Sequence, residues 1–395
     1  MLTRREQLIL LNLLPELGPL RLRRLLEAFG DLDGLWRASA RDLERVNGLG
    51  PRAAARIAAI RQDDSQLRDE LALAARHGVT ILTREEPAYP VALTTIPDPP
   101  LALYVRGTLT EADAVAVGIV GTRRASVYGL TSAERLGAEL AGCGITVVSG
   151  LARGIDAAAH RGALTAGRTL AVLGSGLARL YPPEHAELAE RVAAKGAVLS
   201  EYPMDTPPLP LQFPRRNRLI SGLSLGVVIV EAAQRSGALI TADCALEQGR
   251  EVFAVPGPMR AVTSQGTHQL LKQGARLVTS VDDIVQELRL DMLPSAAAGR
   301  TPYPADEGVR LPSIDAAQDG VPSGVEGLPE AERKVLACLR EQEPRDIDAI
   351  AADSGLELPD VSSLLLQMEL KHLVRQLPGK QFVRHPLEPA ACRSK

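Results

Sequence analysis

The hydrophobic pattern changes twice along the chain of 395 residues, and its longest section alternates between strand-like and helix-like segments. Between residues 114 and 285, short apolar runs recur, and amphipathic segments such as Thr131–Ala141 and Glu184–Ala194 separate most of them. Runs that are apolar throughout are typical of strands buried on both faces of a parallel sheet. The pattern therefore predicts an α/β fold with an extended, Rossmann-like, doubly wound and mostly parallel sheet. The expected strands are Val115–Val120, Ile145–Val148, Thr169–Leu173, Ala197–Leu199, Leu225–Val230, Glu251–Val255 and Arg276–Val278.

The N-terminal section has leucines at helical spacing, which predicts short helices up to residue 60 and another over residues 61–77. The segment Val46–Ile57 looks like the second half of a helix-hairpin-helix, in which a glycine turn opens a helix whose first amides can hold a phosphate. A small helical module for packing or protein contacts would use the same turn. We expect a SAM- or helix-hairpin-helix-like domain at residues 1–77.

The next boundaries follow from composition. A strand is expected at Val79–Thr83, and the prolines between residues 89 and 100 predict an extended connector lying against the sheet domain. That domain should cover residues 78–290. Residues 291–327 are rich in Ala, Pro, Gly and Asp, which predicts a flexible linker.

The last section, residues 328–385, has the pattern of a winged helix: a helix, a helix-turn-helix and a hairpin. Its second helix carries Asp360 and Glu369 against Lys371, and the section holds eight basic and ten acidic residues. Because binding to a nucleic-acid backbone needs clustered positive charge, these numbers favour a protein-contact or regulatory role over strong duplex binding.

Composition narrows the classes of function. The formal net charge is −3, so any nucleic-acid site must be local. Most of the 45 basic residues are arginine, which suits phosphate recognition, although a coding bias explains most of the excess. The four cysteines lie far apart, so neither a disulfide scaffold nor a zinc site is expected, and no other metal or cofactor is indicated. No apolar run approaches the length of a membrane span, and we expect a cytoplasmic protein.

The candidate chemistry lies where the expected strands end. Each strand is followed by Gly, Ser or charged residues, and the carboxyl ends of parallel strands form the usual ligand-binding edge. The segment Phe213–Arg218 places three arginines and an asparagine directly before a buried strand, and we expect a cationic loop there. Residues 213–276 hold eight basic and four acidic residues, so the local field is positive. A phosphodiester strand would supply the missing anion, and Phe213 could stack on a base.

A nucleotide-processing enzyme is the alternative. There is no P-loop, and Gly174-Ser175-Gly176 is too short for a dinucleotide fingerprint because Arg179 stands at the third glycine position. Asp156 and His160 are spaced to form an acid–base pair, but no nucleophile is linked to them. The more ordinary interpretation is that Asp156 caps or orients Arg153 and that His160 is a buried hydrogen-bonding residue.

Many motifs recur in the order found in the DNA-processing protein A family (DprA, also called Smf), which the chain resembles from about residue 80 to residue 285. These motifs are Tyr89-Pro90, Ile96–Pro100, Leu103–Gly107, Gly118–Arg123 with Ser126, Ser149–Asp156 with His160, Gly174–Gly176 with Tyr181-Pro182, Ser200–Pro203, Phe213–Arg218, Glu231-Ala232 with Ser236–Thr241, Val255–Gly257 and Gly266-Thr267. The helical N-terminal section and the winged helix also suit the family.

The resemblance implies a non-enzymatic protein that binds single-stranded DNA, protects incoming strands in natural transformation and loads the RecA recombinase. It also implies a homodimer. Duplex DNA would be bound weakly, or through the N-terminal or winged-helix domain, and no membrane is involved. By motif and by position, the expected DNA-binding residues are Gly121, Thr122, Arg123, Ser126, Ser149, Gly150, Arg153, Gly154, Gly174, Ser175, Phe213, Arg215, Arg216, Asn217, Arg218 and Lys272. The expected dimer contacts are His268, Leu270 and Leu271, although Leu270 could equally be ordinary core.

Overall fold

The computed structural model describes residues 2–15, 17–61, 63–290, 329–340, 344–356, 358–370, 373–377 and 381–384. The expected linker at 291–327 lies outside the described residues. The chain forms two compact units, Met1–Tyr303 and Pro304–Lys395, which are described separately.

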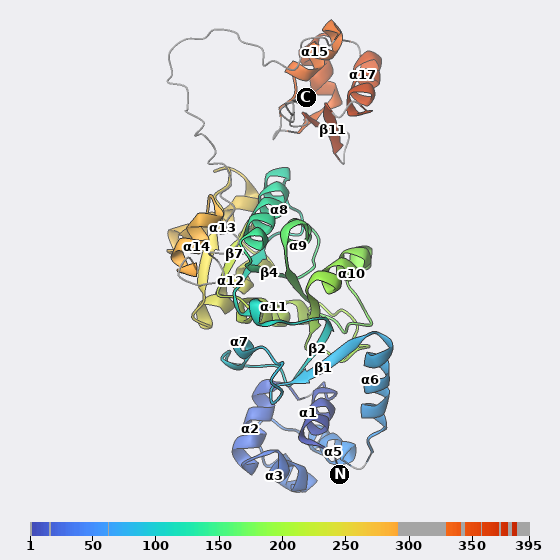
Figure 1. Cartoon of the computed structure of the whole chain (residues 1–395), viewed down its shortest axis with the longest axis vertical. Coiled ribbons are helices and arrows are strands. Elements are labelled where there is room, and N and C mark those ends of the chain that lie inside the picture. The colour runs from blue at the N-terminus through green and yellow to red at the C-terminus, as the bar shows by residue number, and fades with distance from the viewer. Residues whose placement is uncertain are drawn as a thin grey trace, which may run out of the picture. The chain divides into compact units, whose positions relative to one another are not determined.

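A nine-stranded sheet organises the first unit, in the order β1-β2-β6-β5-β4-β3-β7-β8-β9 (Figure 1). The strands from β6 to β9 along this order are parallel to their neighbours, which confirms the mostly parallel, Rossmann-like sheet. The strands β3 to β7 are buried along their whole length, which explains why the sequence pattern revealed them, whereas both residues of the edge strand β9 are exposed. The strands are β1 (Val79–Thr83), β2 (Ala102–Gly107), β3 (Ala116–Val120), β4 (Thr146–Ser149), β5 (Thr169–Val172), β6 (Ala197–Ser200), β7 (Gly226–Ile229), β8 (Glu251–Ala254) and β9 (Arg276–Leu277).

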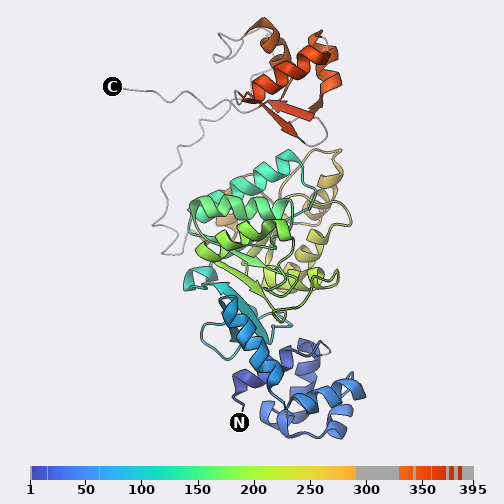
Figure 2. The ribbon, with the colours of Figure 1, turned by 90° about the vertical axis from the view of Figure 1, so that its right-hand side faces the viewer.

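Helices cover both faces of this sheet, as a doubly wound fold requires. The apolar core on one face includes α8, α9 and α14, and the core on the other includes α7, α11, α12 and α13. Helices α8 and α9 run side by side in Figure 2. The helices are α7 (Val91–Thr94), α8 (Val127–Gly142), α9 (Ile155–Ala166), α10 (Ala186–Lys195), α11 (Gln212–Gly222), α12 (Gly237–Glu247), α13 (Gln265–Lys272) and α14 (Val281–Glu287).

The proline-rich passage is more ordered than the sequence suggested. Its last part forms β2, which pairs antiparallel with β6 and with β1, so both strands extend the sheet. The expectation of a simple extended connector was therefore wrong for residues 102–107. Tyr104, fully buried in this strand, adds to the apolar core shared with the N-terminal helices.

The N-terminal helices pack on this extended end of the sheet. Helix α4 and helix α5 flank a turn in which Gly48 has φ +86°, a left-handed conformation that favours glycine. The Glu70 carboxylate accepts a hydrogen bond from the Met204 backbone N–H at 2.7 Å, and Asn12 donates to the Glu201 carbonyl at 3.1 Å. These two bonds join the helices to the segment that follows β6. The helices are α1 (Arg4–Asn12), α2 (Pro19–Phe29), α3 (Leu32–Arg37), α4 (Ala40–Glu44), α5 (Pro51–Ile60) and α6 (Ser65–Arg76).

The second unit contains the expected winged helix. Strands β10, β11 and β12 form a three-stranded antiparallel sheet in the order β10-β12-β11, with a small apolar core beneath it. The hairpin of β11 and β12 is the wing. The elements are α15 (Glu330–Ala337), β10 (Arg345–Asp346), α16 (Ile347–Ser354), α17 (Leu358–Leu370), β11 (Val374–Leu377) and β12 (Gln381–Arg384).

Candidate nucleic-acid interface

The exits of β3, β4 and β7 meet at the carboxyl edge of the sheet. The Thr122 N–H donates to the Glu231 carbonyl at 2.8 Å, and the Ile155 N–H donates to the Thr122 carbonyl at 3.3 Å. Gly154 has φ +75°, and a Cβ there would collide with the Thr122 carbonyl oxygen. The turn from β4 into α9 therefore requires glycine, and it is fastened to the loop that follows β3.

The segment Phe213–Arg218 is not a loop, as the sequence suggested, but the first turns of α11. Pro214 is the third residue of this helix, where the backbone N–H has no partner within the helix to lose. The helix therefore tolerates the proline. Arg215 is exposed, whereas the next three side chains, Arg216–Arg218, are buried.

Phe213 forms an aromatic surface at this edge. Its ring lies under the Arg123 guanidinium, 5.2 Å from the ring centroid, and the centroid of the Tyr181 ring lies 5.6 Å away at 56°. A Cβ on Gly174 would come within 2.9 Å of the Phe213 ring, so glycine allows the ring to approach the β5 exit. The half-buried ring and the exposed guanidinium can together accept a nucleobase and its phosphate.

Arg216 is buried beneath this surface, with 4% of the residue exposed. Its guanidinium donates to the Gly150 carbonyl at 2.7 Å and also to the Val172 carbonyl, so it joins the exits of β4 and β5. Burial lowers the pKa of Arg216 to about 10, and the nearby Asp156 carboxylate opposes that shift. Burial likewise raises the pKa of Asp156, while Arg216 lowers it. This arginine supports the loops from inside.

Arg218 and Asn217 are also turned inward. Arg218 forms ion pairs with Glu201 and, at 2.8 Å, with Asp98. Asn217 donates to the Gly237 carbonyl at the start of α12, at 3.1 Å. The anions that balance Arg218 thus belong to the chain itself, whereas the sequence suggested a bound ligand.

Three serines expected at the site are used in internal hydrogen bonds. Ser126 caps α8 and donates to the buried Glu231 carboxylate at 2.6 Å. Ser149 donates to the Ile119 carbonyl at 2.6 Å, and Ser175 donates to the Arg179 carbonyl at 2.8 Å. Their hydroxyl groups therefore hold the loops of this edge together.

The exposed cations near Phe213 come from three elements. Arg123 follows β3, Arg215 lies on the outer side of α11, and Arg153 follows β4. Arg153 pairs with the exposed Glu184. Because exposed ion pairs are weak, a phosphate could replace Glu184 as the partner of Arg153.

Asp156 and His160 do not form an acid–base pair. His160 is fully buried, and its Nδ1 donates to Thr169 Oγ1 at 2.7 Å, since that hydroxyl donates its own hydrogen to the Val147 carbonyl. Burial lowers the pKa of His160 to about 3, so the ring is neutral. Asp156 faces Arg216 instead, and Arg153 pairs elsewhere. His160 is therefore a core hydrogen-bonding residue, while the proposed link between Asp156 and Arg153 was wrong.

Lys272 does not join the other expected residues. Helix α13 starts where Gly266 packs against Ala232 beyond β7 and leads into the start of β9, so its last residue, Lys272, points away from the carboxyl edge. Of the expected dimer contacts, Leu270 is 7% exposed and lies in the core. His268 donates to the Gly257 carbonyl at 3.0 Å, and Leu271 is partly buried.

Sequence reasoning missed Tyr181 and Arg124 as members of this surface. Tyr181 lies in the loop after β5 and reaches Phe213 only through the fold. Arg124 is exposed beside Arg123, and its backbone N–H donates to Thr122 Oγ1 at 3.2 Å. The Arg123-Arg124 pair was a usable sequence signal, but nothing in the sequence pairs Tyr181 with Phe213.

Among the described residues, no group of three or more His, Cys, Asp or Glu side chains could hold a metal ion. No helix in the same part of the chain is long and apolar enough to cross a membrane.

The sequence and the structure of the chain are similar to those of several known proteins. The family described as DNA recombination-mediator protein A matches residues 80–289, and the DprA winged helix domain matches residues 322–380. Protein Smf of Escherichia coli (strain K12) is 43% identical over 295 residues, which covers 74% of this chain and 74% of its own. Protein Smf of Synechocystis is 36% identical over 381 residues, covering 93% and 95%. The X-ray structure of DNA processing protein A from Streptococcus pneumoniae superposes with a TM-score of 0.62 at 34% identity, over 73% of this chain and 99% of that one.

Proposed function

This chain belongs to the DNA recombination-mediator protein A family, and we propose that it binds single-stranded DNA at the carboxyl edge of its parallel sheet. The family's DNA-processing and recombination role motivates the proposal, and the chemistry of the edge supports it.

The observation that carries the proposal is the position of Arg123 over the Phe213 ring, 5.2 Å from its centroid. A base needs an apolar face to stack on, and its phosphate needs a cation within reach. Both groups stand at the same strand exits, beside the exposed Arg124 and Arg215. A duplex keeps its bases paired and stacked, so it could engage these arginines but not the ring.

The test is a fluorescence-anisotropy titration of labelled single-stranded and duplex DNA across a range of salt concentrations. The parent should prefer the single strand. Phe213→Ala should weaken single-strand binding by about 1–3 kcal/mol, the value of one base stacked on an aromatic ring. Arg123→Ala should weaken it too, and should lower the dependence of log K on log salt by about 0.7 for one phosphate.

Arg106→Ala is the control, because Arg106 lies on β2 away from the carboxyl edge, where it pairs with Glu190 of α10. Unchanged affinity in both site variants would refute the placement of the strand. Equal affinity of the parent for single and duplex DNA would refute the proposed preference.

We further propose that the bound strand is protected and passed to the RecA recombinase during natural transformation, as the family resemblance implies. The protein would then act as a homodimer in the cytoplasm, where RecA works. Nuclease protection of single strands and RecA strand exchange in the presence of a single-strand-binding protein test this step. Failure of Phe213→Ala in both assays is expected, and full activity of that variant would contradict the proposal.

We propose that the protein acts by binding, not by catalysis. Asp156 and His160, the acid–base candidates, are buried and turned to different partners, Arg216 and Thr169. Turnover of a nucleoside monophosphate by the purified protein would revive the enzymatic alternative.

A further inference from the structure

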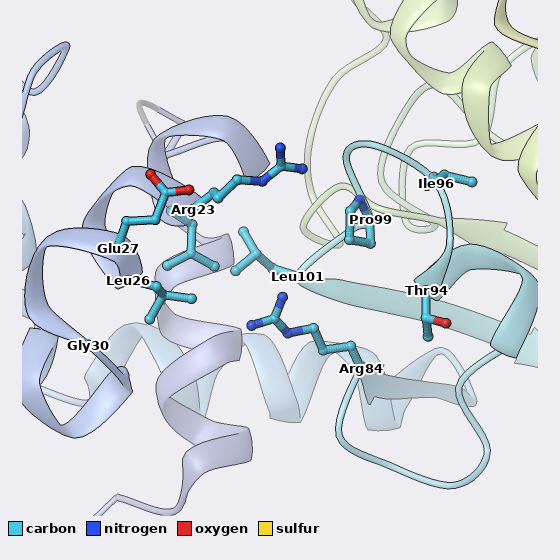
Figure 3. Close-up of a pocket in the computed structure, with 10 residues that line it drawn as sticks. Arg23, Leu26, Glu27, Gly30, Arg84, Thr94, Ile96, Pro99 and Leu101 are labelled. Carbon is cyan, nitrogen blue, oxygen red and sulfur yellow. The ribbon is translucent and has the colours of Figure 1, made fainter. Parts of the chain in front are cut away.

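A cleft lies between helix α2 and the strands that extend the sheet, β1 and β2. It has a volume of about 440 Å³, within the usual range of small-ligand sites. Its floor is apolar: Leu22, Ile96 and Leu101 are each 4% exposed. Arg23 of α2 and Arg84, which follows β1, also line it, and in Figure 3 their guanidinium groups lie on either side of the Leu101 side chain. The cleft thus combines an apolar surface with two cations.

The sheet topology places this cleft on the same edge as the Phe213 surface. Strand β2 is antiparallel to β6, with Tyr104 opposite Ser200 at the carboxyl end of β6, so Leu101 lies beyond that end. Strand β1 is antiparallel to β2, with Thr83 opposite Ala102, and Arg84 therefore lies beyond the same edge. In order along this edge come the exits of β3, β4, β5 and β6, and then the cleft.

The distance between the Phe213 surface and the cleft is short enough for one continuous DNA strand to reach both. Three strand spacings lie between β5 and β1, which amounts to about 14 Å at ~4.8 Å each. A DNA strand with a rise of ~3.4 Å per nucleotide covers that distance in about four nucleotides.

The loop that carries Asp98 connects the two surfaces. Asp98 pairs with Arg218 of α11 at 2.8 Å, and the neighbouring Pro97 carbonyl accepts a hydrogen bond from Arg23. Burial raises the pKa of Asp98, while Arg218, Arg23 and Arg215 lower it, so cations of the cleft and of α11 act on one carboxylate.

The charges of the cleft favour a phosphate near Arg84. Arg84 is exposed, and Arg23 keeps donors to spare, since a guanidinium has five N–H groups. The nearby acids are largely engaged: Glu85 lies 3.9 Å from Arg4, and Glu86 lies 3.4 Å from Arg5. Glu27 also lines the cleft, and its carboxylate opposes anion binding.

We propose that this cleft is a second nucleotide subsite for the same DNA strand. A base would lie on the apolar floor of the cleft, and its phosphate would lie between Arg84 and Arg23. The inference rests on the proposed function, because it extends the path of the strand bound at Phe213. The subsite can be reached only by a strand long enough to span both surfaces.

The test compares the affinity of the full-length protein for oligothymidylates of about 3 and about 20 nucleotides, at equal salt, because only the longer one can span both surfaces. Arg84→Ala should weaken binding of the longer strand about fivefold and leave the shorter strand unchanged. Arg23→Ala combined with Arg84→Ala should lower the salt dependence for the longer strand by about 0.7, for the one phosphate held at the subsite. Glu27→Gln should tighten its binding about twofold.

Arg76→Ala is the matched control, because Arg76 is exposed before β1, at the opposite edge of the sheet. Thermal unfolding of each variant checks that it is folded, which is expected for an exposed arginine. If Arg123→Ala weakens both strands while Arg84→Ala changes neither, or weakens both equally, the subsite is refuted and the proposed function stands. If the parent binds neither strand, both proposals are refuted.

Discussion

At the scale of single residues, burial divides the arginines near Phe213 into two groups. Arg123 and Arg215 are exposed and can meet a ligand, whereas Arg216 is buried and hydrogen-bonded to the chain, and Arg218 is buried and ion-paired within it. Sequence alone cannot make this division, because it depends on Asp98, Glu201 and the carbonyls that the fold brings to α11. Two of the three arginines next to this core strand therefore stabilise the fold instead of facing a ligand.

Replacing Arg216 tests whether its buried guanidinium stabilises the fold. Arg216→Met should lower the free energy of unfolding by about 3–5 kcal/mol, because it removes the main cationic influence on the buried Asp156 carboxylate and the donor to the Gly150 and Val172 carbonyls. Combining it with Asp156→Asn should cost less than the sum of the two single changes. The neighbouring Arg215→Met, on the exposed side of α11, should stay within about 0.5 kcal/mol of the parent in urea unfolding. Additive losses in the double variant would show that the two residues are not coupled.

His160 predicts a specific pH dependence of stability. Its pKa is about 3 in the folded chain and near its ordinary value of 6.5 when unfolded. Below the unfolded pKa, the unfolded chain binds a proton that the folded chain does not, so stability falls as the pH drops from about 6.5 toward 3. The loss attributable to this ring is on the order of 3 kcal/mol between pH 7 and pH 4.

The difference between the parent and His160→Gln isolates this contribution. The buried Asp156 and Glu201 have raised pKa values, which act in the opposite direction but are common to both proteins. Urea unfolding from pH 7 to pH 4 should show a smaller acid loss in His160→Gln than in the parent, whereas His77→Gln, at an exposed position, should follow the parent. Parallel curves for the parent and His160→Gln would contradict the assignment.

At the scale of elements, the strands were predictable and helix α11 was not. The central strands are buried on both faces, so each appears in the sequence as a continuous apolar run. Helix α11 buries Arg216, Asn217 and Arg218, and its inward side therefore has no apolar stripe at this end. Strand β2 was missed because the prolines before it masked a short strand, which pairs with β1 on one side and β6 on the other.

The packing of α8 against α9 gives a prediction at this scale. A Cβ on Gly137 of α8 would collide with the Ala159 carbonyl oxygen of α9, so the two backbones touch there. Gly137→Ala should therefore destabilise the protein by at least about 1–3 kcal/mol through overpacking. Gly142→Ala, on the same helix with its nearest neighbour at 3.8 Å, should be neutral or stabilising by up to about 1 kcal/mol. Thermal unfolding distinguishes these outcomes, and equal effects at the two positions would contradict the close contact.

At the scale of the whole molecule, the presence of N-terminal helices, a mostly parallel sheet and a winged helix was predictable from periodicity and composition. The attachment of the N-terminal helices to the sheet was not. It depends on the buried bond from Met204 to Glu70 and on the two strands that lengthen the sheet. That attachment creates the cleft at Arg84, so the proposed path of DNA is a property of the assembled unit and not of one motif.

The central claim is that a single DNA strand lies across Phe213 at the carboxyl edge, and photo-crosslinking tests it most directly. A single strand carrying 5-iodouracil, irradiated on the full-length protein and digested with trypsin, should attach to an aromatic residue that stacks on a base. We predict crosslinks in the peptides Leu180–Arg191 and Gly196–Arg215, which contain Tyr181 and Phe213. They should be lost from the second peptide in Phe213→Ala. Crosslinks found only outside these two peptides, with the same yield in Phe213→Ala, would contradict the account.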